Sequence, residues 1–434
     1  MTRRTPKLCL VGPPHPYLVN PEAQAPLGLL YVAAAAREIG GAEVSFVDLR
    51  AQQPDGGDWF ASFNLPEADI YGITGTCLDV RMVNMVARSI KVRDRGARVV
   101  VGGPLSLSRE LVDPDVDAVV HGEGEHAILD VLRDYPHLRR DYFAERIMDL
   151  DSLPMPARDL LGENLGGGVF ARGKEYFAGG STVISTSRGC PSACHFCASV
   201  NIWNRRVAYR SAESVTKEIE HIVAEYGVRQ LRFSDDNLTC NRPRLEDLCG
   251  VLAGKKIAWR CSIRVKPNDV AMFEMMRGAG CTEVCFGIES GDQHVLHALN
   301  KGTHVKDNRE AIENAHAAGL AVRLLMMCGC PGETTRTVDH NIEFLESVAG
   351  KYDALALTNF APLPGTRVAS HPDECGCEIL DEDIDHFNLV FYGPEGERKW
   401  ANLVRPVGLT IEQLDENKAR MRAYAKSTGM LGEG

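Results

Sequence analysis

Short apolar runs alternate with helical segments along the first third of the chain. Ranges 27–39 and 80–95 have helical character. The apolar runs around them are predicted strands: 7–11, 43–49, 69–74, 97–101 and 117–120. Short buried strands separated by helices indicate an α/β fold, with a parallel sheet covered by helices on both faces. Ligands of such sheets bind beyond the carboxyl ends of the strands, where this chain has turns rich in Gly and Pro.

The alternation weakens between 141 and 180, where Pro154, Pro156 and the run 166–168 of glycines indicate a linker. It resumes with six further predicted strands: 182–186, 230–234, 258–263, 283–288, 321–327 and 354–359. Strand-helix units of about 30 residues each are typical of a parallel (β/α) barrel or partial barrel. We therefore predict a first domain at 1–140, a linker at 141–180, a barrel at 181–370 and a cap or tail at 371–434.

Composition narrows the class of protein. The chain has 434 residues, of which 44% are apolar and 25% charged, so it is neither disordered nor fibrous. The net charge of −11 argues against a nucleic-acid partner and favours a neutral or cationic substrate. No apolar run approaches the length of about 20 residues that spans a bilayer, and the run 8–12 is too short for a signal peptide. We expect a cytoplasmic protein without a membrane partner.

The 14 cysteines point to chemistry, because disulfides do not persist in a reducing compartment. Three of them, Cys190, Cys194 and Cys197, lie within eight residues directly after the first barrel strand. Iron–sulfur clusters are held by thiolates, normally four, so this loop would leave one iron for another ligand. A structural zinc site is the alternative, with His195 as the nominal fourth ligand. The pairs Cys328/Cys330 and Cys375/Cys377 are either core residues or ligands of an auxiliary cluster.

The cysteine loop, with Phe196 just before its third cysteine, resembles the cluster loop of the radical S-adenosylmethionine (SAM) superfamily. The resemblance covers 182–369. It implies that Cys190, Cys194 and Cys197 hold a [4Fe-4S] cluster whose fourth iron binds the amino and carboxylate groups of SAM. One electron from the cluster then cleaves SAM to methionine and a 5'-deoxyadenosyl radical, which removes a hydrogen atom from the substrate.

Later segments fit the same family in order. They are Phe233-Ser-Asp-Asp-Asn237, Cys261-Ser-Ile-Arg264, Phe286-Gly-Ile-Glu-Ser290, Gly329-Cys-Pro-Gly-Glu333 and Phe360-Ala-Pro-Leu-Pro-Gly365. The resemblance implies a set of cofactor-binding residues: Phe196, Ser234, Asp235, Arg264, Glu289, Ser290, Arg323, Phe360 and Pro362. For three residues the sequence also allows other roles. Arg323 is also suited to an ion pair inside the barrel. Asp235 and Asp236 are suited to substrate binding, a helix cap or acid–base catalysis.

The first domain is similar to the Rossmann-like cobalamin-binding module that precedes many radical SAM barrels. The segments Pro26-Leu-Gly-Leu29, Gly102-Gly-Pro104 and Gly122-Glu-Gly-Glu125 carry this likeness. The chain lacks the Asp-x-His-x-x-Gly pattern of modules that ligate cobalt through histidine. Cobalamin is therefore a candidate cofactor, and the implied fold class is a Rossmann-like parallel sheet followed by a partial (β/α)6 barrel.

Two enzymatic hypotheses and one non-enzymatic hypothesis follow. The domain order and short tail resemble the radical SAM diol dehydratases that deoxygenate paromamine in aminoglycoside antibiotic biosynthesis. That resemblance implies a lyase, a flavodoxin- or ferredoxin-type reducing partner and an NADPH-dependent reductase acting on the product. The alternative is cobalamin-dependent methylation of a carbon by the same radical start. A non-catalytic protein that binds a metal cluster is the third hypothesis, which the ordered SAM-site segments disfavour.

Overall fold

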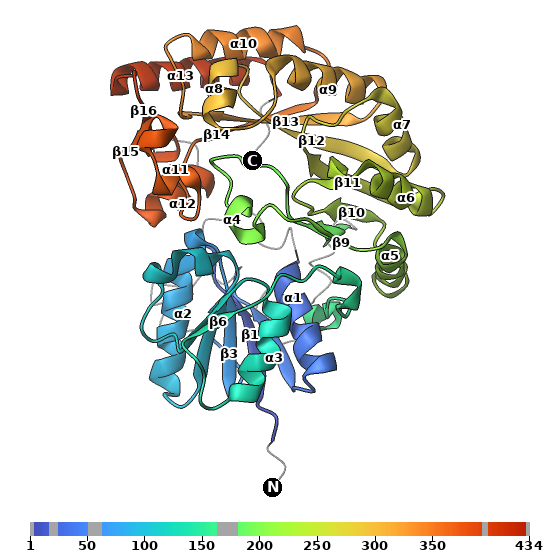
Figure 1. Cartoon of the computed structure of the whole chain (residues 1–434), viewed down its shortest axis with the longest axis vertical. Coiled ribbons are helices and arrows are strands. Elements are labelled where there is room, and N and C mark those ends of the chain that lie inside the picture. Colours follow the sequence, from blue (N-terminus) through green and yellow to red (C-terminus); the bar gives the residue numbers. More distant parts are fainter. Residues whose placement is uncertain (1–3, 17–24, 51–62, 163–180, 393–397, 431–434) are drawn as a thin grey trace. The chain divides into compact units, whose positions relative to one another are not determined.

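The computed structural model describes residues 4–16, 25–50, 63–162, 181–392 and 398–430 (Figure 1). The chain forms two compact units. One comprises Met1–Val183 with His221–Val228, and the other comprises Ile184–Glu220 with Arg229–Gly434. The glycine run at 166–168 lies outside the described residues. No helix in the described ranges combines the length and apolar character needed to cross a membrane.

The first unit is a parallel sheet with strand order β2-β1-β3-β4-β5-β6. Its strands are β1 Leu8–Gly12, β2 Val44–Asp48, β3 Ile70–Thr74, β4 Arg98–Gly102, β5 Ala118–His121 and β6 Asp141–Phe143. Its helices are α1 Leu27–Ala34, continued by a π-helical turn at Ala35–Ile39, α2 Val80–Arg93 and α3 Gly124–Asp134. The predicted Rossmann-like parallel sheet is confirmed. The edge strand β6 escaped prediction because it is three residues long and only Tyr142 in it is buried.

The order of the first three strands creates a switch point in this sheet. Strand β1 lies between β2 and β3, so the chain leaves its carboxyl end in one direction and returns in the other. A crevice for ligands forms at such a point. Two neighbouring loops meet beside it, because Leu105 donates its backbone N–H to the carbonyl oxygen of Gly75 at 2.8 Å. Gly103, at φ +80°, passes so close that a Cβ there would lie 2.6 Å from Thr74 Oγ1.

The second sheet forms a partial (β/α)6 barrel with strand order β14-β13-β12-β11-β10-β7. Its strands are β7 Ser181–Ile184, β10 Gln230–Phe233, β11 Ala258–Ile263, β12 Cys281–Glu289, β13 Ala321–Cys328 and β14 Ala354–Asn359. Its longer helices are α5 Ala212–Tyr226, α6 Arg242–Leu252, α7 Val270–Gly278, α9 Val305–Ala317 and α10 Thr337–Ser347. All six barrel strands were predicted from the sequence, and for β11 and β14 the boundaries agree.

Short elements decorate the barrel. The antiparallel pairs are β8 Ser187–Arg188 with β9 Ala208–Tyr209, and β15 Cys377–Ile379 with β16 Val404–Pro406. The short helices are α4 Ser199–Trp203, α8 Gln293–Ala298, α11 Arg367–Ser370 and α12 Ile384–Tyr392. The last helix, α13 Ile411–Ser427, begins at a capping box in which Thr410 and Gln413 bond each other's backbone N–H. It packs against α10, β13 and β14, so the polar region after the barrel covers barrel strands.

The barrel strands bury alternate residues. In β12, Val284, Phe286 and Ile288 are fully buried, whereas the residues between them are partly exposed. Strand β13 shows the same alternation. Helices α7, α9 and α10 lie outside these strands (Figure 1), so the buried set faces the helices and the other set faces the barrel lumen. The lumen face therefore remains available to polar residues and ligands.

Trp259 is the largest fully buried side chain on the helix side of the barrel. Its ring stacks on Phe233 at 4.8 Å, and its Nε1–H donates to the carbonyl oxygen of Ala279 at 2.8 Å. We predict that Trp259→Ala lowers the free energy of unfolding of the barrel by about 3–5 kcal/mol, because the substitution leaves a large cavity. Denaturant unfolding followed by far-UV circular dichroism measures the change. The exposed Val92→Ala is the control, and an equal effect of both substitutions would contradict the prediction.

Candidate active site

The three loop cysteines follow strands β7 and β8 and precede helix α4. All three are free thiols. Cys194 is buried, and Cys190 and Cys197 are half-buried. Within the loop the Cys197 N–H donates to the carbonyl oxygen of Cys194 at 3.2 Å, which makes a tight turn. The sulfurs therefore sit on one compact loop at the carboxyl end of the first barrel strand, where ligands of barrels bind.

Asp236 fastens both ends of this loop. Its Oδ2 accepts the N–H of Gly189 at 2.9 Å, just before the first cysteine, and its Oδ1 accepts the hydroxyl of Ser199, just after the third. Gly189 has φ +104°, and a Cβ there would lie 2.2 Å from the carbonyl oxygen of Arg206. The loop thus enters at a position that only glycine fits and is closed by one carboxylate from the end of β10.

Asp235, the neighbouring residue, is buried beneath the loop. Its carboxylate accepts the N–H and the hydroxyl of Thr186, at 2.8 and 2.6 Å, and the hydroxyl of Ser187. Burial raises the pKa of Asp235, and the hydroxyl and backbone donors oppose that rise. Both of its oxygens are engaged by the β7–β8 turn, so the structure gives it a scaffold contact. A helix cap, one of the sequence alternatives for this residue, is not what it forms.

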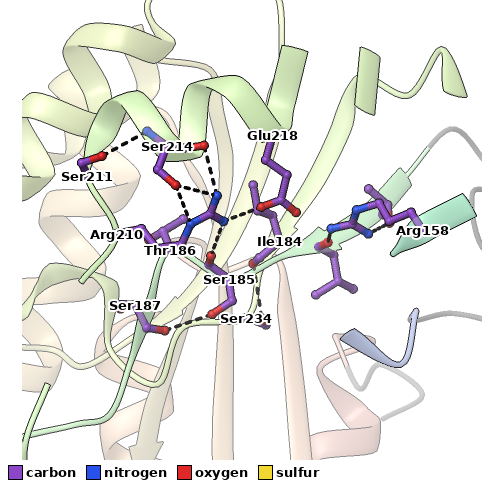
Figure 2. A network of polar contacts seen from close by, with 12 residues as sticks. Arg158, Ile184, Ser185, Thr186, Ser187, Arg210, Ser211, Ser214, Glu218 and Ser234 are labelled. Atoms are coloured by element: carbon purple, nitrogen blue, oxygen red, sulfur yellow. Dashed lines mark hydrogen bonds and ion pairs between the residues drawn. The ribbon is translucent and has the colours of Figure 1, made fainter. Parts of the chain in front are cut away.

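A second set of polar contacts holds the same turn (Figure 2). Arg210 donates to the carbonyl oxygen of Ser185 at 3.0 Å and to the hydroxyl of Ser214 at 3.2 Å, and it pairs with the buried Glu218. Arg244 donates to the carbonyl oxygen of Thr186 at 2.6 Å. Sequence reasoning missed this layer, because an isolated Arg or Glu carries no pattern that reveals a buried partner far along the chain.

The segment after α8 also holds the cysteine loop, through two hydrogen bonds. The His195 N–H donates to the carbonyl oxygen of Leu299 at 3.0 Å, and the Asn300 side chain donates to the carbonyl oxygen of Ala193 at 2.8 Å. Arg264 Nη1 donates a hydrogen bond to the sulfur of Cys194 at 3.2 Å. This contact places a positive charge beside the sulfur of the second loop cysteine. Arg264, predicted as a cofactor contact, therefore reaches the cluster loop itself.

Glu289 ends β12 in a left-handed conformation, at φ +63°. Its Oε1 lies 2.5 Å from the ammonium nitrogen of Lys301, and both side chains are nearly fully buried. The Lys301 nitrogen also lies 5.7 Å from the ring centroid of Phe196, within range of a cation–π interaction. The structure thus brings two predicted residues, Glu289 and Phe196, together through a lysine that the sequence analysis did not single out.

The remaining predicted contacts divide into scaffold and lumen positions. Ser290 is fully buried and donates its hydroxyl to Asn341 Oδ1 at 2.8 Å, which fixes the loop after β12 to α10. Ser234 donates its hydroxyl to the carbonyl oxygen of Ile184 at 3.2 Å. Arg323 forms an ion pair of 3.6 Å with Glu283, so the internal ion pair left open by the sequence is present.

Phe360 lies in a buried apolar cluster with Cys330, Cys375 and Cys377, and Phe196 packs against this cluster. Pro362 is also buried. Burial raises the pKa of Cys377 to about 12, and it raises the pKa of Cys330 and of Cys375 above the usual thiol value. Neutral thiols in apolar surroundings are core residues. The geometry therefore gives no support to an auxiliary cluster at these cysteines.

The donor set of the loop, three closely spaced thiols, fits an iron–sulfur cluster. Among the described residues, no three or more His, Cys, Asp or Glu side chains converge on one position for a metal ion. A zinc ion needs such convergence, and His195 Nδ1 instead lies 3.1 Å from the carbonyl oxygen of Ala298. The thiolates of a [4Fe-4S] cluster bind separate irons, so three spaced thiols around a tight turn suit it.

Comparisons with known proteins show which families and relatives this chain resembles. The profile of the Radical SAM superfamily matches residues 184–345, and that of the B12 binding domain matches 22–132. An uncharacterized methyltransferase of Pyrococcus horikoshii is 30% identical over 368 residues, covering 79% of this chain and 77% of the relative. The cytidylyl-2-hydroxyethylphosphonate methyltransferase of Streptomyces wedmorensis is 24% identical, and the match covers 85% of this chain and 82% of the relative.

Solved structures of low sequence identity share the fold. The radical SAM methyltransferase TsrM from Kitasatospora setae, solved with tryptophan and a SAM analogue, has a TM-score of 0.73 at 17% identity and covers 99% of this chain and 91% of its own. The cobalamin-dependent SAM radical enzyme OxsB with aqua-cobalamin has a TM-score of 0.63 at 20% identity, covering 79% and 52%. These likenesses confirm the α/β fold class with its two parallel sheets.

We predict that Asp236→Ala weakens retention of the cluster, because it frees both ends of the cysteine loop. Losing a partner that orients metal ligands typically costs about 10–100-fold in metal affinity. Iron and sulfide per chain after anaerobic reconstitution and desalting report the effect. Asp247→Ala, which removes an exposed carboxylate from α6, serves as the matched control. Equal iron contents in the two variants would show that Asp236 does not hold the loop.

Glu333 gives a second prediction, on pH. Burial raises the pKa of this carboxyl to about 7, although it accepts the N–H groups of Gly329 and Cys330 at 2.7 and 3.0 Å. The folded state then binds the proton more tightly than the unfolded state, so the stabilisation is complete below pH 4.5 and is lost as the pH rises to about 7.

Glu333→Gln should remove this part of the pH dependence. Urea unfolding at several pH values between 4.5 and 7 gives the free energy of each protein. Relative to wild type, the Gln variant should gain stability as the pH rises, whereas the exposed Glu346→Gln should run parallel to wild type. If the free energy of unfolding of Glu333→Gln also runs parallel to that of wild type across this pH range, the raised pKa of Glu333 is contradicted.

The comparisons and the geometry agree on one family. The superfamily profile covers the barrel, and the three free thiols occupy the loop after the first barrel strand. The relative from Pyrococcus extends the likeness over most of both chains. The chain belongs to the radical SAM superfamily, which implies a [4Fe-4S] cluster and SAM as cofactors, and it carries a B12 binding domain ahead of its radical SAM domain.

Proposed function

We propose that this chain is a cobalamin-dependent radical SAM methyltransferase that methylates a small polar molecule. The observation that carries the proposal is the 30% identity to a methyltransferase over more than three quarters of both chains. The B12 binding domain supports it, because cobalamin is a carrier of methyl groups. The Streptomyces relative is also named as a methyltransferase. The dehydratase hypothesis receives no support from these relatives, so the alternative raised by the sequence becomes the main proposal.

In this proposal, Cys190, Cys194 and Cys197 hold the cluster and leave one iron for SAM. When bound, the cluster supplies the electron that cleaves SAM, and a flavodoxin- or ferredoxin-type partner would reduce it. The chain's own contribution is positioning. Arg264 donates to the Cys194 sulfur at 3.2 Å, and Asp236 fixes the two ends of the loop. Pre-organised ligands spare the reaction the cost of ordering the loop at each turnover.

The Glu289–Lys301 pair would set one wall of the SAM site. By resemblance, Glu289 contacts the ribose of SAM at the end of the fourth barrel strand. The ammonium of Lys301 fixes the Glu289 carboxylate at 2.5 Å and links it to the ring of Phe196 in the cysteine loop. A Cβ on Gly287 would lie 2.5 Å from Glu289 Oε1, so this glycine leaves the space that the carboxylate occupies. Lys301 therefore links the cysteine loop to Glu289, the residue proposed to contact the ribose.

Cobalamin would bind by the backbone of the first unit. The strand order changes direction between β1 and β3, which end at Gly12 and Thr74, and the Thr74–Gly75 segment follows at this switch point. Gly103 tolerates no side chain against that segment. A planar macrocycle suits such a backbone edge. Because the chain lacks the Asp-x-His-x-x-Gly pattern, no histidine of that motif would hold the cofactor. When bound, cobalamin supplies the carrier of the methyl group.

The products of SAM test the proposal directly. Anaerobically reconstituted protein is incubated with SAM and a low-potential reductant, with and without hydroxocobalamin. A methyltransferase of this kind should bind the cobalamin through gel filtration and form S-adenosylhomocysteine only when cobalamin is present. A Cys194→Ala variant controls for cluster-independent hydrolysis of SAM. If 5'-deoxyadenosine forms but no S-adenosylhomocysteine appears even when cobalamin is supplied, methyl transfer is wrong and the dehydratase hypothesis regains its place.

A further inference from the structure

Three arginines from three barrel strands share the lumen face of the sheet. They are Arg232 on β10, Arg260 on β11 and Arg323 on β13, each between buried neighbours; Arg232 and Arg323 are partly exposed and Arg260 is exposed. Arg232 and Arg260 are direct partners in the β10–β11 register. Arg260 is in turn the partner of Glu283 on β12. The three guanidinium groups and one carboxylate therefore form one layer of charge within the barrel, which we call the arginine layer.

The arginine layer is short of negative charge. The Glu283 carboxylate lies 3.7 Å from Arg260 Nη1 and 3.6 Å from Arg323 Nε, so it is shared between two cations. Arg232 has no hydrogen bond or ion pair with any residue in the part of the chain that the structure describes. Burial lowers the pKa of Arg232, and the like charges of Arg260 and Arg323 lower it further. The layer thus carries two positive charges that protein groups do not neutralise.

Such an arrangement lowers the stability of the fold. Like charges placed directly opposite on neighbouring strands repel each other, and this protein as a whole has a net charge of −11. Overall acidity would recruit a cation to the surface, but the lumen has the opposite local sign. A destabilising polar arrangement kept inside a fold marks a functional position. The planar fork of arginine binds phosphate-type oxygens through paired N–H groups.

We propose that the arginine layer binds a doubly charged oxyanion, the phosphate or phosphonate group of the substrate. This inference rests on the proposed function, since it names the class of molecule that the radical SAM barrel would act on. Arg260 lies on β11 and Arg264 directly follows that strand, four residues later, about 13 Å away at the rise of a β-strand. Arg264 contacts the cluster-loop sulfur. The anionic end of the substrate would thus be anchored below the SAM site, with its carbon skeleton extending toward it.

Inorganic phosphate is the probe for this site. Isothermal titration calorimetry of the reconstituted protein, without SAM or reductant, measures phosphate affinity in wild type and Arg232→Gln. The Gln variant should bind phosphate about tenfold more weakly, in keeping with the loss of one charge-assisted contact. Arg229→Gln is the matched control, because Arg229 is an exposed arginine three residues earlier and should leave the affinity unchanged. Acetate, with a single charge, should bind more weakly than phosphate.

Arg232→Lys separates binding from folding. It keeps the charge but loses the fork, so it should bind phosphate with intermediate affinity even if the Gln variant does not fold. The proposal is overturned if wild type does not bind phosphate, if acetate binds as tightly, or if Arg229→Gln weakens binding as much as Arg232→Gln. It also fails if Arg232→Gln weakens SAM binding in place of phosphate binding. Since no turnover is involved, failure of methyl transfer and failure of the oxyanion site are observed separately.

Discussion

One pair of adjacent carboxylates at the end of β10 holds the radical SAM site together. Asp235 binds the turn beneath the cysteine loop, and Asp236 joins the residues just before and just after the loop. A loop that must present three sulfurs and still leave one iron open cannot be rigidified by a fourth protein ligand. Its order has to come from hydrogen bonds outside the cluster, and these two side chains supply them from one dipeptide.

The proposed chemistry depends on that order. The loop is fixed on one side by the β7–β8 turn and β10, and on the other by the segment after α8, where Leu299 and Asn300 bond its backbone. Lys301 continues the same segment and reaches Glu289 on β12. The cysteine loop, the segment after α8 and Glu289 are thus joined by one set of hydrogen bonds and ion pairs within the barrel. The arginine layer lies deeper in the same lumen and would position the substrate relative to it.

The sequence revealed the elements whose pattern is local. Buried strands such as β13 and β14 are apolar runs of ordinary length, and three closely spaced cysteines form a motif that can be recognised without any structure. It did not reveal partners that meet only through the fold. Asp235 and Asp236 look alike in the sequence, yet one is buried and the other exposed. The ion pair of Lys301 with Glu289 and the lack of a partner at Arg232 depend on strand register, which no local pattern encodes.

The central claim is that the cysteine loop holds a [4Fe-4S] cluster with one iron open to SAM. Electron paramagnetic resonance of the reduced, reconstituted protein tests it most directly, with spectra taken before and after the addition of SAM. The account predicts a reduced [4Fe-4S] signal whose g-values change when SAM is added, because SAM binds the open iron. A signal that SAM leaves unaltered, or a protein that holds zinc and gives no cluster signal, would contradict it.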